Sequence, residues 1–325
     1  MRMFGPALLA TLALSAMLPT APAMAQRDDA ESRYLPAPAI SYPGGVESQR
    51  DVTYAELSGF RPLTLDLYLP PRTGKPQPVL VFVHGGAWLH RTARDGGEFR
   101  DFPAVLAGFA ARGYVVASVN YRFSGEARFP GAVQDVGSAI QWLRGQAARY
   151  DIDPDHVVLW GSSAGGQIAT LIGTGCDAPA LQPPAAKGIA TSPPCVQGVI
   201  DWYGLIDFEG PPSAVSKAQR AYLGCGPGDC PPGLARSASP LAYIDAKDPP
   251  FLIQHGNADV TVSPQQSVQL HDALKAAGVP VEIVLYPGVA HGFARVPGGG
   301  PDDAVNRQAL AKVNEFLDRV APVKR

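Results

Sequence analysis

The spacing of hydrophobic residues changes along the chain, and two patterns result. In PLTLDLYLP, residues 62–70, leucines alternate with Thr64, Asp66 and Tyr68. This alternation predicts a half-buried strand at an antiparallel edge of a sheet. Six near-continuous apolar runs follow, which are typical of parallel strands covered on both faces. They are PVLVFVHGG, GYVVASVNY, HVVLWG, VQGVIDWYG, PFLIQHG and VPVEIVLYPG.

Helical patterns lie between several of these runs. FPAVLAGFAARG ends in a glycine, PGAVQDVGSAIQWLRGQAARY starts near a proline and ends near an arginine, and SPQQSVQLHDALKAAG closes on Gly278. These residues match the rules for helix termini. A last helix is expected over about residues 302–320. Alternating strands and helices predict an α/β fold with a mostly parallel sheet.

One segment interrupts the alternation. Residues 205–247 are rich in proline and glycine and show no strand of the same kind. A long connection inside a compact domain is more often functional than idle. We therefore expect a lid-like insertion here, with surface decoration as the alternative.

The first 25 residues predict a signal peptide. A basic start at Arg2 and an apolar run precede Ala23-Met24-Ala25, a small-x-small cleavage site. The alternatives are a buried helix or a membrane anchor, but the run is short for spanning a bilayer. We expect export to the periplasm or the medium after cleavage near Ala25, an extended arm over 26–49, and a single domain over 50–325. No later segment predicts stable membrane insertion.

Composition limits the function classes. The chain has 325 residues, of which 46% are hydrophobic, and a formal net charge of −2. These values allow one large core, and they provide no basic footprint for nucleic acid.

Four cysteines in an exported chain indicate disulfides, and four allow three connectivities. Cys225 and Cys230 flank a tight turn, GPGD, which favours a local pair there. Cys176 and Cys195 would then close the proline-rich loop between them. Unpaired thiols are the alternative. None of the four has the spacing of a zinc site, so no metal is expected.

The stretch HVVLWGSSAGGQIATLIG, residues 156–173, joins an apolar strand to a helical pattern through a small-residue turn. Strand, sharp turn and helix form the context of a nucleophile elbow. Only one register fits Gly-x-Ser-x-Gly, which makes Ser163 the candidate nucleophile and Ser162 a spacer.

A serine nucleophile needs a base and an acid that orients the base. Among six histidines, His291 follows the last apolar run, at the edge of an open α/β sheet where catalytic groups gather. The acid is expected between the two in chain order, after a strand, and Asp259 fits. Asp201 and Asp207 are its rivals.

The oxyanion of the reaction needs backbone donors. Ala164 follows the nucleophile and supplies one N–H. His84-Gly85-Gly86-Ala87 comes after an earlier strand, and its glycines let the main chain approach a substrate closely. We therefore expect the amides of Gly85, Gly86 and Ala164 to form the oxyanion hole.

Taken together, HGGAW, GSSAGG, Asp259 and His291 resemble an α/β-hydrolase of the carboxylesterase type. LTLDLYLP, VNYRFS…RFPGAVQDVGSAIQWLR and DIDPDHVVLWGSSAGGQIA resemble the bacterial secreted esterase branch, which includes feruloyl-esterase-like and hormone-sensitive-lipase-related enzymes. The resemblance covers about residues 50–320. Two positions depart from its pattern: Ala87 replaces a common third glycine, and Gln167 replaces histidine or asparagine.

The resemblance implies an exported serine esterase that works without a cofactor. Its expected partners are small-molecule or carbohydrate-linked esters with short-chain or aromatic acyl groups. One alternative is a peptidase similar to the prolyl-oligopeptidase catalytic domain. The other is a non-catalytic extracellular binding protein on a hydrolase scaffold.

Overall fold

The structure is a computed structural model that describes residues 39–97, 99–184, 193–209, 216–226, 230, 231, 233–296 and 299–324. The predicted signal peptide and its cleavage site lie outside these residues. Residues Ala37–Arg325 form one compact unit. No helix in the described ranges has both the length and the apolar character needed to cross a membrane.

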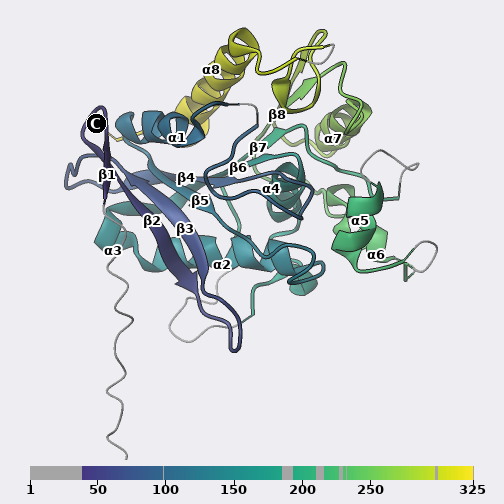
Figure 1. Cartoon of the computed structure of the whole chain (residues 1–325), viewed down its shortest axis with the longest axis horizontal. Helices are drawn as coiled ribbons and strands as arrows, with labels where there is room; N and C mark the ends of the chain where they lie inside the picture. The colour runs from purple at the N-terminus through teal and green to yellow at the C-terminus, as the bar shows by residue number, and fades with distance from the viewer. Residues whose placement is uncertain are drawn as a thin grey trace, which may run out of the picture. The chain divides into compact units, whose positions relative to one another are not determined.

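A nine-stranded sheet runs through this unit (Figure 1). The first three strands and β5 pair antiparallel, and all pairs from β5 to β9 are parallel. The mostly parallel sheet predicted from the apolar runs is therefore confirmed. In spatial order the strands are β1 (Ile40–Tyr42), β2 (Val46–Ala55), β3 (Leu63–Leu69), β5 (Val115–Val119), β4 (Gln77–Val83), β6 (Ile152–Ser162), β7 (Gly198–Trp202), β8 (Phe251–Gly256) and β9 (Val281–Tyr286).

The sheet begins earlier in the sequence than expected. Residues 40–42 and 46–49, assigned above to an extended arm, lie in β1 and β2, which pair through Ile40 and Ser48. The strand at 63–69 is also not at an edge, since β3 pairs with β2 on one side and β5 on the other. Its Asp66 is fully buried and accepts hydrogen bonds from the Asp51 N–H and the Arg94 guanidinium.

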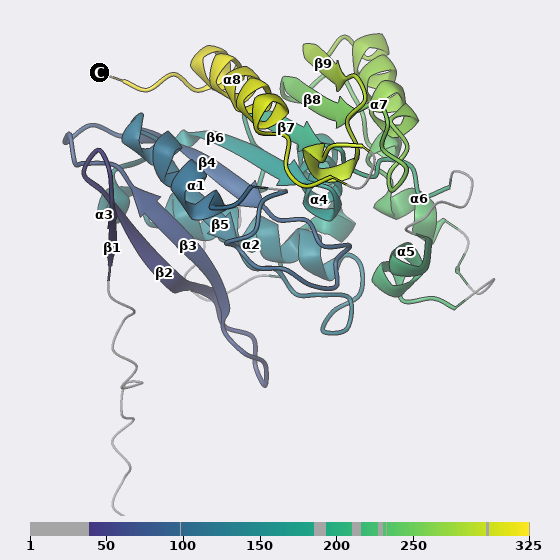
Figure 2. The same cartoon turned by 45° about the horizontal axis from the view of Figure 1, so that its top comes forward.

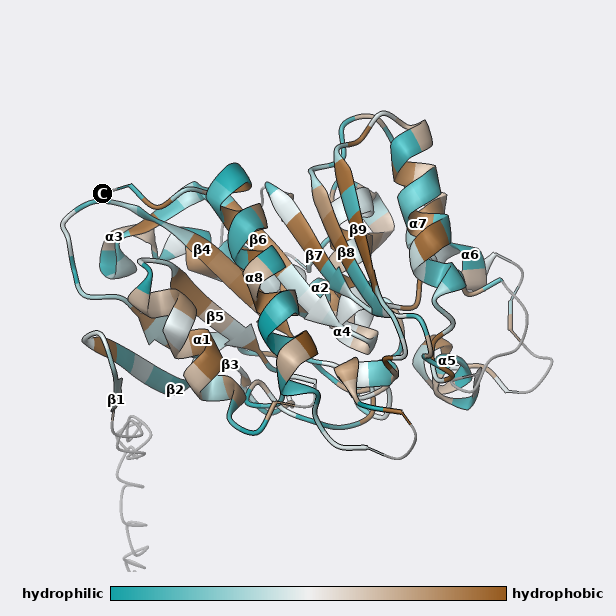
Figure 3. Ribbon diagram, turned by 90° about the horizontal axis from the view of Figure 1, so that it is seen from above, coloured by the Kyte–Doolittle hydropathy of each residue, from teal (hydrophilic) through white to brown (hydrophobic). Residues whose placement is uncertain are grey.

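Helices cover both faces of the sheet and create two hydrophobic cores (Figures 1 and 2). Alternate residues of one strand point to opposite faces. In β4, Leu80 and Phe82 join the core beneath α1 (Phe102–Ala111) and α8 (Asp303–Val320). Val81 joins the other core, with α2 (Gly131–Gly145), α4 (Ala164–Gly175) and α7 (Gln265–Ala276). In Figure 3 the strands are mostly hydrophobic, and the helices beside them contain both hydrophobic and hydrophilic residues. The short α3 (Ala147–Tyr150) precedes β6.

The insertion at 205–247 contributes two short helices, α5 (Ser216–Leu223) and α6 (Leu234–Ala238). Both are attached to the domain. Tyr222 is fully buried, and its carbonyl accepts a hydrogen bond of 2.8 Å from the N–H of Phe129. Ala238 is also fully buried. The described part of the insertion is therefore packed against the domain.

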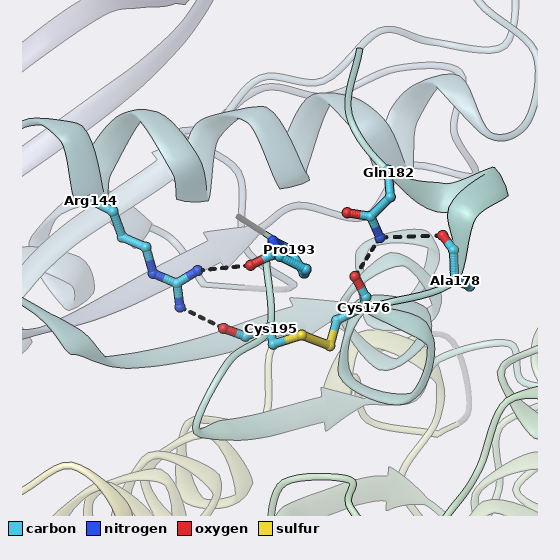
Figure 4. The surroundings of a disulfide bond; sticks show 6 residues. All are labelled: Arg144, Cys176, Ala178, Gln182, Pro193 and Cys195. Carbon is cyan, nitrogen blue, oxygen red and sulfur yellow. Dashed lines mark hydrogen bonds between the residues drawn. A yellow bond between two sulfur atoms is a disulfide. The ribbon is translucent and has the colours of Figure 1, made fainter. Parts of the chain in front are cut away.

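Both disulfide pairings favoured from the sequence are present. Cys225 pairs with Cys230 beside α5, and Cys176 pairs with Cys195 across a separation of 19 residues. Figure 4 shows that backbone carbonyls on both sides of the second bridge are also held, because Gln182 donates to the Cys176 carbonyl and Arg144 to the Cys195 carbonyl. The bridge thus joins the end of α4 to the segment that enters β7.

We expect the double variant Cys176→Ser/Cys195→Ser to lower the free energy of unfolding by about 3 kcal/mol, because the bridge restricts the unfolded chain. Cys225→Ser/Cys230→Ser should cost only about 2 kcal/mol, since it closes a much shorter loop. Urea denaturation of the two variants and the wild type would measure the difference. Equal losses would show that loop length does not control these two contributions.

A buried carboxyl lies behind the elbow. Asp201 in β7 is fully buried, and its Oδ1 accepts a hydrogen bond of 3.1 Å from the N–H of Gly204. Its Oδ2 has no partner among the described residues. Burial raises the pKa of Asp201 to about 7, against the opposing charge of His255 and the Gly204 hydrogen bond.

This shift predicts a pH-dependent stability. Between its ordinary pKa of about 3.9 and its folded value, Asp201 holds a proton that the unfolded chain has released. Stability therefore falls as pH rises through that window. We expect Asp201→Asn to melt together with the wild type at acid pH, and about 5 °C above it at alkaline pH. Thermal melts across this pH range test this expected difference in melting temperature. The prediction is wrong if the wild type is more stable than Asp201→Asn at alkaline pH.

Candidate active site

The elbow places Ser163 at a sharp turn between β6 and α4. Its φ is 53° and its ψ is −117°, a positive-φ conformation that costs energy for a residue with a side chain. The turn also needs glycines on both sides. A Cβ at Gly161 would lie 2.1 Å from the Gly165 carbonyl oxygen, and one at Gly165 would lie 2.0 Å from the Val83 carbonyl oxygen. The Gly-x-Ser-x-Gly pattern is thus a steric requirement of this turn.

Ser163, His291 and Asp259 form one chain of hydrogen bonds. His291 Nε2 lies 2.9 Å from Ser163 Oγ, and His291 Nδ1 lies 2.6 Å from Asp259 Oδ2. The carboxylate only accepts, so Nδ1 carries a hydrogen and Nε2 of the neutral ring accepts from the serine hydroxyl. This tautomer is the one that a base needs to take a proton from serine.

A second histidine holds the same carboxylate. His255 Nε2 lies 3.1 Å from Asp259 Oδ2 and 3.1 Å from the Val262 carbonyl oxygen, so Nε2 must donate. His255 Nδ1 lies 2.7 Å from the Ser267 hydroxyl on α7. The other oxygen of Asp259 accepts from the N–H groups of Thr261 and Val262.

These donors determine the charge of Asp259. Burial alone would raise its pKa, but the hydrogen bonds and charges of His255 and His291 outweigh burial and hold the pKa well below its usual range. The carboxylate therefore stays ionised, and it stabilises positive charge on the His291 ring.

The predicted oxyanion residues surround the same position. Gly85 lies against the elbow, since a Cβ there would lie 3.2 Å from Ser163 Cβ. Gly86 has a φ of 104°, and its carbonyl accepts from the N–H groups of Leu89 and His90. Ala87 continues the turn with a φ of 54°. This left-handed value favours glycine and explains physically why a third glycine is common at this position.

The buried side chain of His84 supports this loop. Its ring is fully buried, stacks on Tyr121 at 4.5 Å between centroids, and donates through Nδ1 to the Gly85 carbonyl at 2.7 Å. Burial lowers the pKa of His84 to about 4, against the opposing effect of the Gly85 hydrogen bond, so the ring is neutral. The Tyr121 hydroxyl donates to the His84 carbonyl at 3.0 Å.

A cavity of about 190 Å³ opens at these groups. It brings together five of the six predicted catalytic and oxyanion residues, Asp259 lying behind His291. The remaining wall comes from the loop after β4, from the end of β6 and from the segments after β7, β8 and β9. The lining residues are Gly85, Gly86, Ala87, Trp88, His90, Arg91, Gly97, Ser162, Ser163, Ala164, Tyr203, Leu205, Thr261, Val262, His291 and Gly292.

The aromatic residues in and beside the insertion have separate roles. Tyr203 lies in the cavity wall, with its ring edge-on to His291 at 4.8 Å between centroids. Trp202 instead packs in the core against Trp160 at 4.6 Å. Tyr222 stacks on Trp88 at 4.6 Å, and Phe208 lies 5.8 Å from the same ring.

Gln167 connects the oxyanion loop to the insertion. Its Oε1 accepts from Trp88 Nε1 at 3.2 Å, and its Nε2 donates to the Ala238 carbonyl at 3.0 Å. The side chain is fully buried. The residue that departs from the resembled pattern is therefore a tie between two parts of the site.

The rival acids are not in the hydrogen-bonded chain. Asp201 lies within β7, as expected, and Asp207 Oδ1 accepts from the Glu209 N–H. Among the described residues, no group of three His, Cys, Asp or Glu side chains could hold a metal ion.

Sequence reasoning missed His255 as a partner of Asp259, and it did not place Arg91 in the cavity wall. His255 lies near the end of β8, and its position four residues before Asp259 was a signal. Arg91 lies in the loop after the glycine pair, with no motif of its own.

Comparison with known proteins agrees with this geometry. The BD-FAE family model matches residues 65–274. Esterase LipC of Mycobacterium tuberculosis is 33% identical over 76% of this chain and 59% of its own length, and LipQ of the same organism is 30% identical over 80% and 60%. The chain thus spans less than two thirds of these relatives.

Solved structures of esterases have the same fold. A thermophilic esterase, Est2, of the Planctomycetes species Thermogutta terrifontis is 28% identical with a TM-score of 0.68, covering 83% of this chain and 92% of that one. A truncated carbohydrate esterase from gut microbiota is 28% identical with a TM-score of 0.65, covering 76% and 89%. The resemblance noted in the sequence is confirmed, and the chain belongs to the BD-FAE family of α/β-hydrolase serine esterases.

Proposed function

We propose that this protein is an exported serine carboxylesterase that acts through an acyl-enzyme on short-chain or aromatic acyl esters. The observation that carries the proposal is the hydrogen-bonded chain from Ser163 through His291 to Asp259, at a cavity lined by Gly85, Gly86 and Ala164. All the groups that acyl transfer through serine requires are in reach of one another.

The mechanism follows from the donors and acceptors. Ser163 Oγ attacks the ester carbonyl while His291 Nε2 takes its proton, and the ionised Asp259 stabilises the imidazolium. The backbone N–H groups of Gly85, Gly86 and Ala164 bind the oxyanion. His291 then protonates the leaving alcohol. Water activated by the same ring releases the acid and restores Ser163.

Cavity size supports the acyl preference. A volume of about 190 Å³ is below the range of roughly 300 to 1,000 Å³ typical of sites for drug-sized ligands. Among similar structures, Est2 has been solved with propionate bound, and another is a carbohydrate esterase. We therefore propose small acyl groups, including those linked to carbohydrate, over long-chain lipids.

Export is supported by the two disulfides. Such bridges form and persist in oxidising compartments and are rare in the cytosol. The predicted signal peptide at residues 1–25 is consistent with this location.

The test is turnover of p-nitrophenyl esters of increasing chain length, together with methyl ferulate, by the protein that begins at Gln26. We expect turnover of p-nitrophenyl acetate and a decline toward long chains. Paraoxon, which phosphorylates Est2, should inactivate the protein and label Ser163 in a peptide mass spectrum. Faster turnover of the long-chain esters than of the acetate would contradict the acyl assignment, and a label elsewhere would contradict the nucleophile.

A further inference from the structure

The cavity has an uneven distribution of charge. Its ionisable lining residues are His90, Arg91, Tyr203 and His291, in addition to the serines, and neither Asp nor Glu lines it among the described residues. Arg91 is the permanent positive charge in this set. A cavity lined in this way attracts anions.

The same loop contains an arginine in the opposite situation. Arg94 donates to Asp66 Oδ2 at 2.7 Å and to Asp51 Oδ2 at 2.8 Å, so two carboxylates neutralise it. Arg91 pairs with no carboxylate within the described ranges. Its hydrogen bond is from Nη1 to the Gly97 carbonyl at 3.3 Å. Asp95 of this loop instead accepts from the N–H and hydroxyl of Thr92.

The stem of Arg91 is fixed against the oxyanion loop. A Cβ at Gly86 would lie 3.1 Å from Arg91 Cγ, so the side chain passes closely over this glycine. The guanidinium then lies beside Gly97, whose carbonyl oxygen it contacts. Gly97 is itself close to two other groups of the wall, because a Cβ added to it would lie 2.8 Å from the Tyr203 hydroxyl and 3.4 Å from the Gly292 carbonyl oxygen. Arg91 therefore spans the loop after β4 from Gly86 to Gly97, and Gly97 borders the part of the cavity wall that contains Gly292.

This position lies on the leaving-group side of the reaction. His291 gives its proton to the departing alcohol, so the alcohol part of the ester must lie beside His291 and Gly292. The Arg91 guanidinium lines the same cavity at Gly97, next to Gly292, where it could meet a substituent of the alcohol. The backbone agrees with a role for the side chain, since Arg91 has a φ of 80°, a conformation that glycine or asparagine adopts at lower cost.

We propose that Arg91 binds an anionic group, such as a carboxylate, carried by the alcohol part of the ester. The proposal rests on the esterase function above and names a substrate class for it. Planar guanidinium and carboxylate groups match in geometry, and a charge-assisted hydrogen bond of this kind is stronger than a neutral one. Arg91 is then a specificity residue, and it takes no part in the bond changes at the carbonyl.

The test compares substrates that differ in one charge. 4-Acetoxybenzoate has a carboxylate on its alcohol part, 4-acetoxybenzamide has a neutral group of the same shape there, and mono-4-nitrophenyl succinate has its carboxylate on the acyl part. We expect Arg91→Gln to raise KM for 4-acetoxybenzoate about tenfold or more and to leave KM for the benzamide within about twofold. Arg91→Lys, which keeps the charge, should recover part of the loss.

Arg72→Gln is the matched control. It removes the same charge at an exposed site where Arg72 lies 3.7 Å from Asp151, and it should change none of the three KM values. The unmodified protein gives a second measurement: added salt should raise KM for 4-acetoxybenzoate and not for the benzamide, because salt screens an accessible ion pair.

Two results would overturn the proposal. Equal changes for 4-acetoxybenzoate and the benzamide in Arg91→Gln would reduce Arg91 to a structural residue. A charge dependence seen only with the succinate ester would place the anion on the acyl side. p-Nitrophenyl acetate separates this inference from the proposed function, because a folded wild type that leaves this ester intact would contradict the esterase function itself.

Discussion

Ser163→Ala is expected to lower kcat for p-nitrophenyl acetate by about five to six orders of magnitude, with little change in KM. The reason is that, among the described residues, the hydroxyl hydrogen-bonded to His291 Nε2 at 2.9 Å is that of Ser163. The oxyanion groups and the cavity remain, so binding persists while the covalent step is lost. A residual rate above that of water is also expected from those groups.

Ser162→Ala is the informative control, because the two serines are adjacent in the sequence. Ser162 ends β6 and belongs to the strand ladder through its pairing with Trp202. We expect this variant to keep most of the wild-type activity. Both variants should melt near the wild type, which separates loss of chemistry from loss of fold. If Ser163→Ala stayed active, Ser163 would not be the nucleophile.

Asp259→Asn is expected to lower kcat by about three to four orders of magnitude. The carboxylate accepts from His291 Nδ1 and from His255 Nε2 through the same oxygen, Oδ2. An amide has one acceptor oxygen and one NH₂ group, so it cannot serve both this pair and the N–H groups of Thr261 and Val262. If the NH₂ faces His291, the ring takes the tautomer that cannot accept the serine proton.

Asp207→Asn is the matched control for this variant, because Asp207 is an acid of similar sequence context outside the hydrogen-bonded chain. It should keep most of the activity. Steady-state kinetics of both variants show which aspartate orients His291. If the two variants had equal activities, or if Asp207→Asn lost more activity, the assignment of Asp259 as the acid would be wrong.

The parts of the site that follow local rules could be read from the sequence. The elbow was predictable because its glycines are fixed by contacts within one turn and its neighbouring strand, as at Gly161 and Gly165. The parallel strands were predictable because burial on both faces leaves continuous apolar runs. Asp259 and His291 follow strands of this kind, so chain order was enough to select them.

Other parts depend on tertiary contacts that have no local signal. His255 became a partner of Asp259 because α7 brings Ser267 to its other nitrogen. Strands β1 and β2 lie at the solvent-facing end of the sheet, where Val46 and Ser48 are buried among polar neighbours, so no apolar alternation marks them. Whether a carboxylate pairs with Arg91 depends on which side chains the nearby acids contact in the folded protein, and this cannot be predicted from the sequence.

The tie made by Gln167 has a consequence for how the enzyme's specificity can change. One amide holds both Trp88, next to the oxyanion loop, and Ala238, in the insertion. A substitution in the insertion that displaces Ala238 would therefore alter the support of the loop that contains the proposed oxyanion groups. Insertion variants are accordingly expected to change kcat together with KM, and we expect a new specificity gained in the insertion to require compensating changes around Trp88.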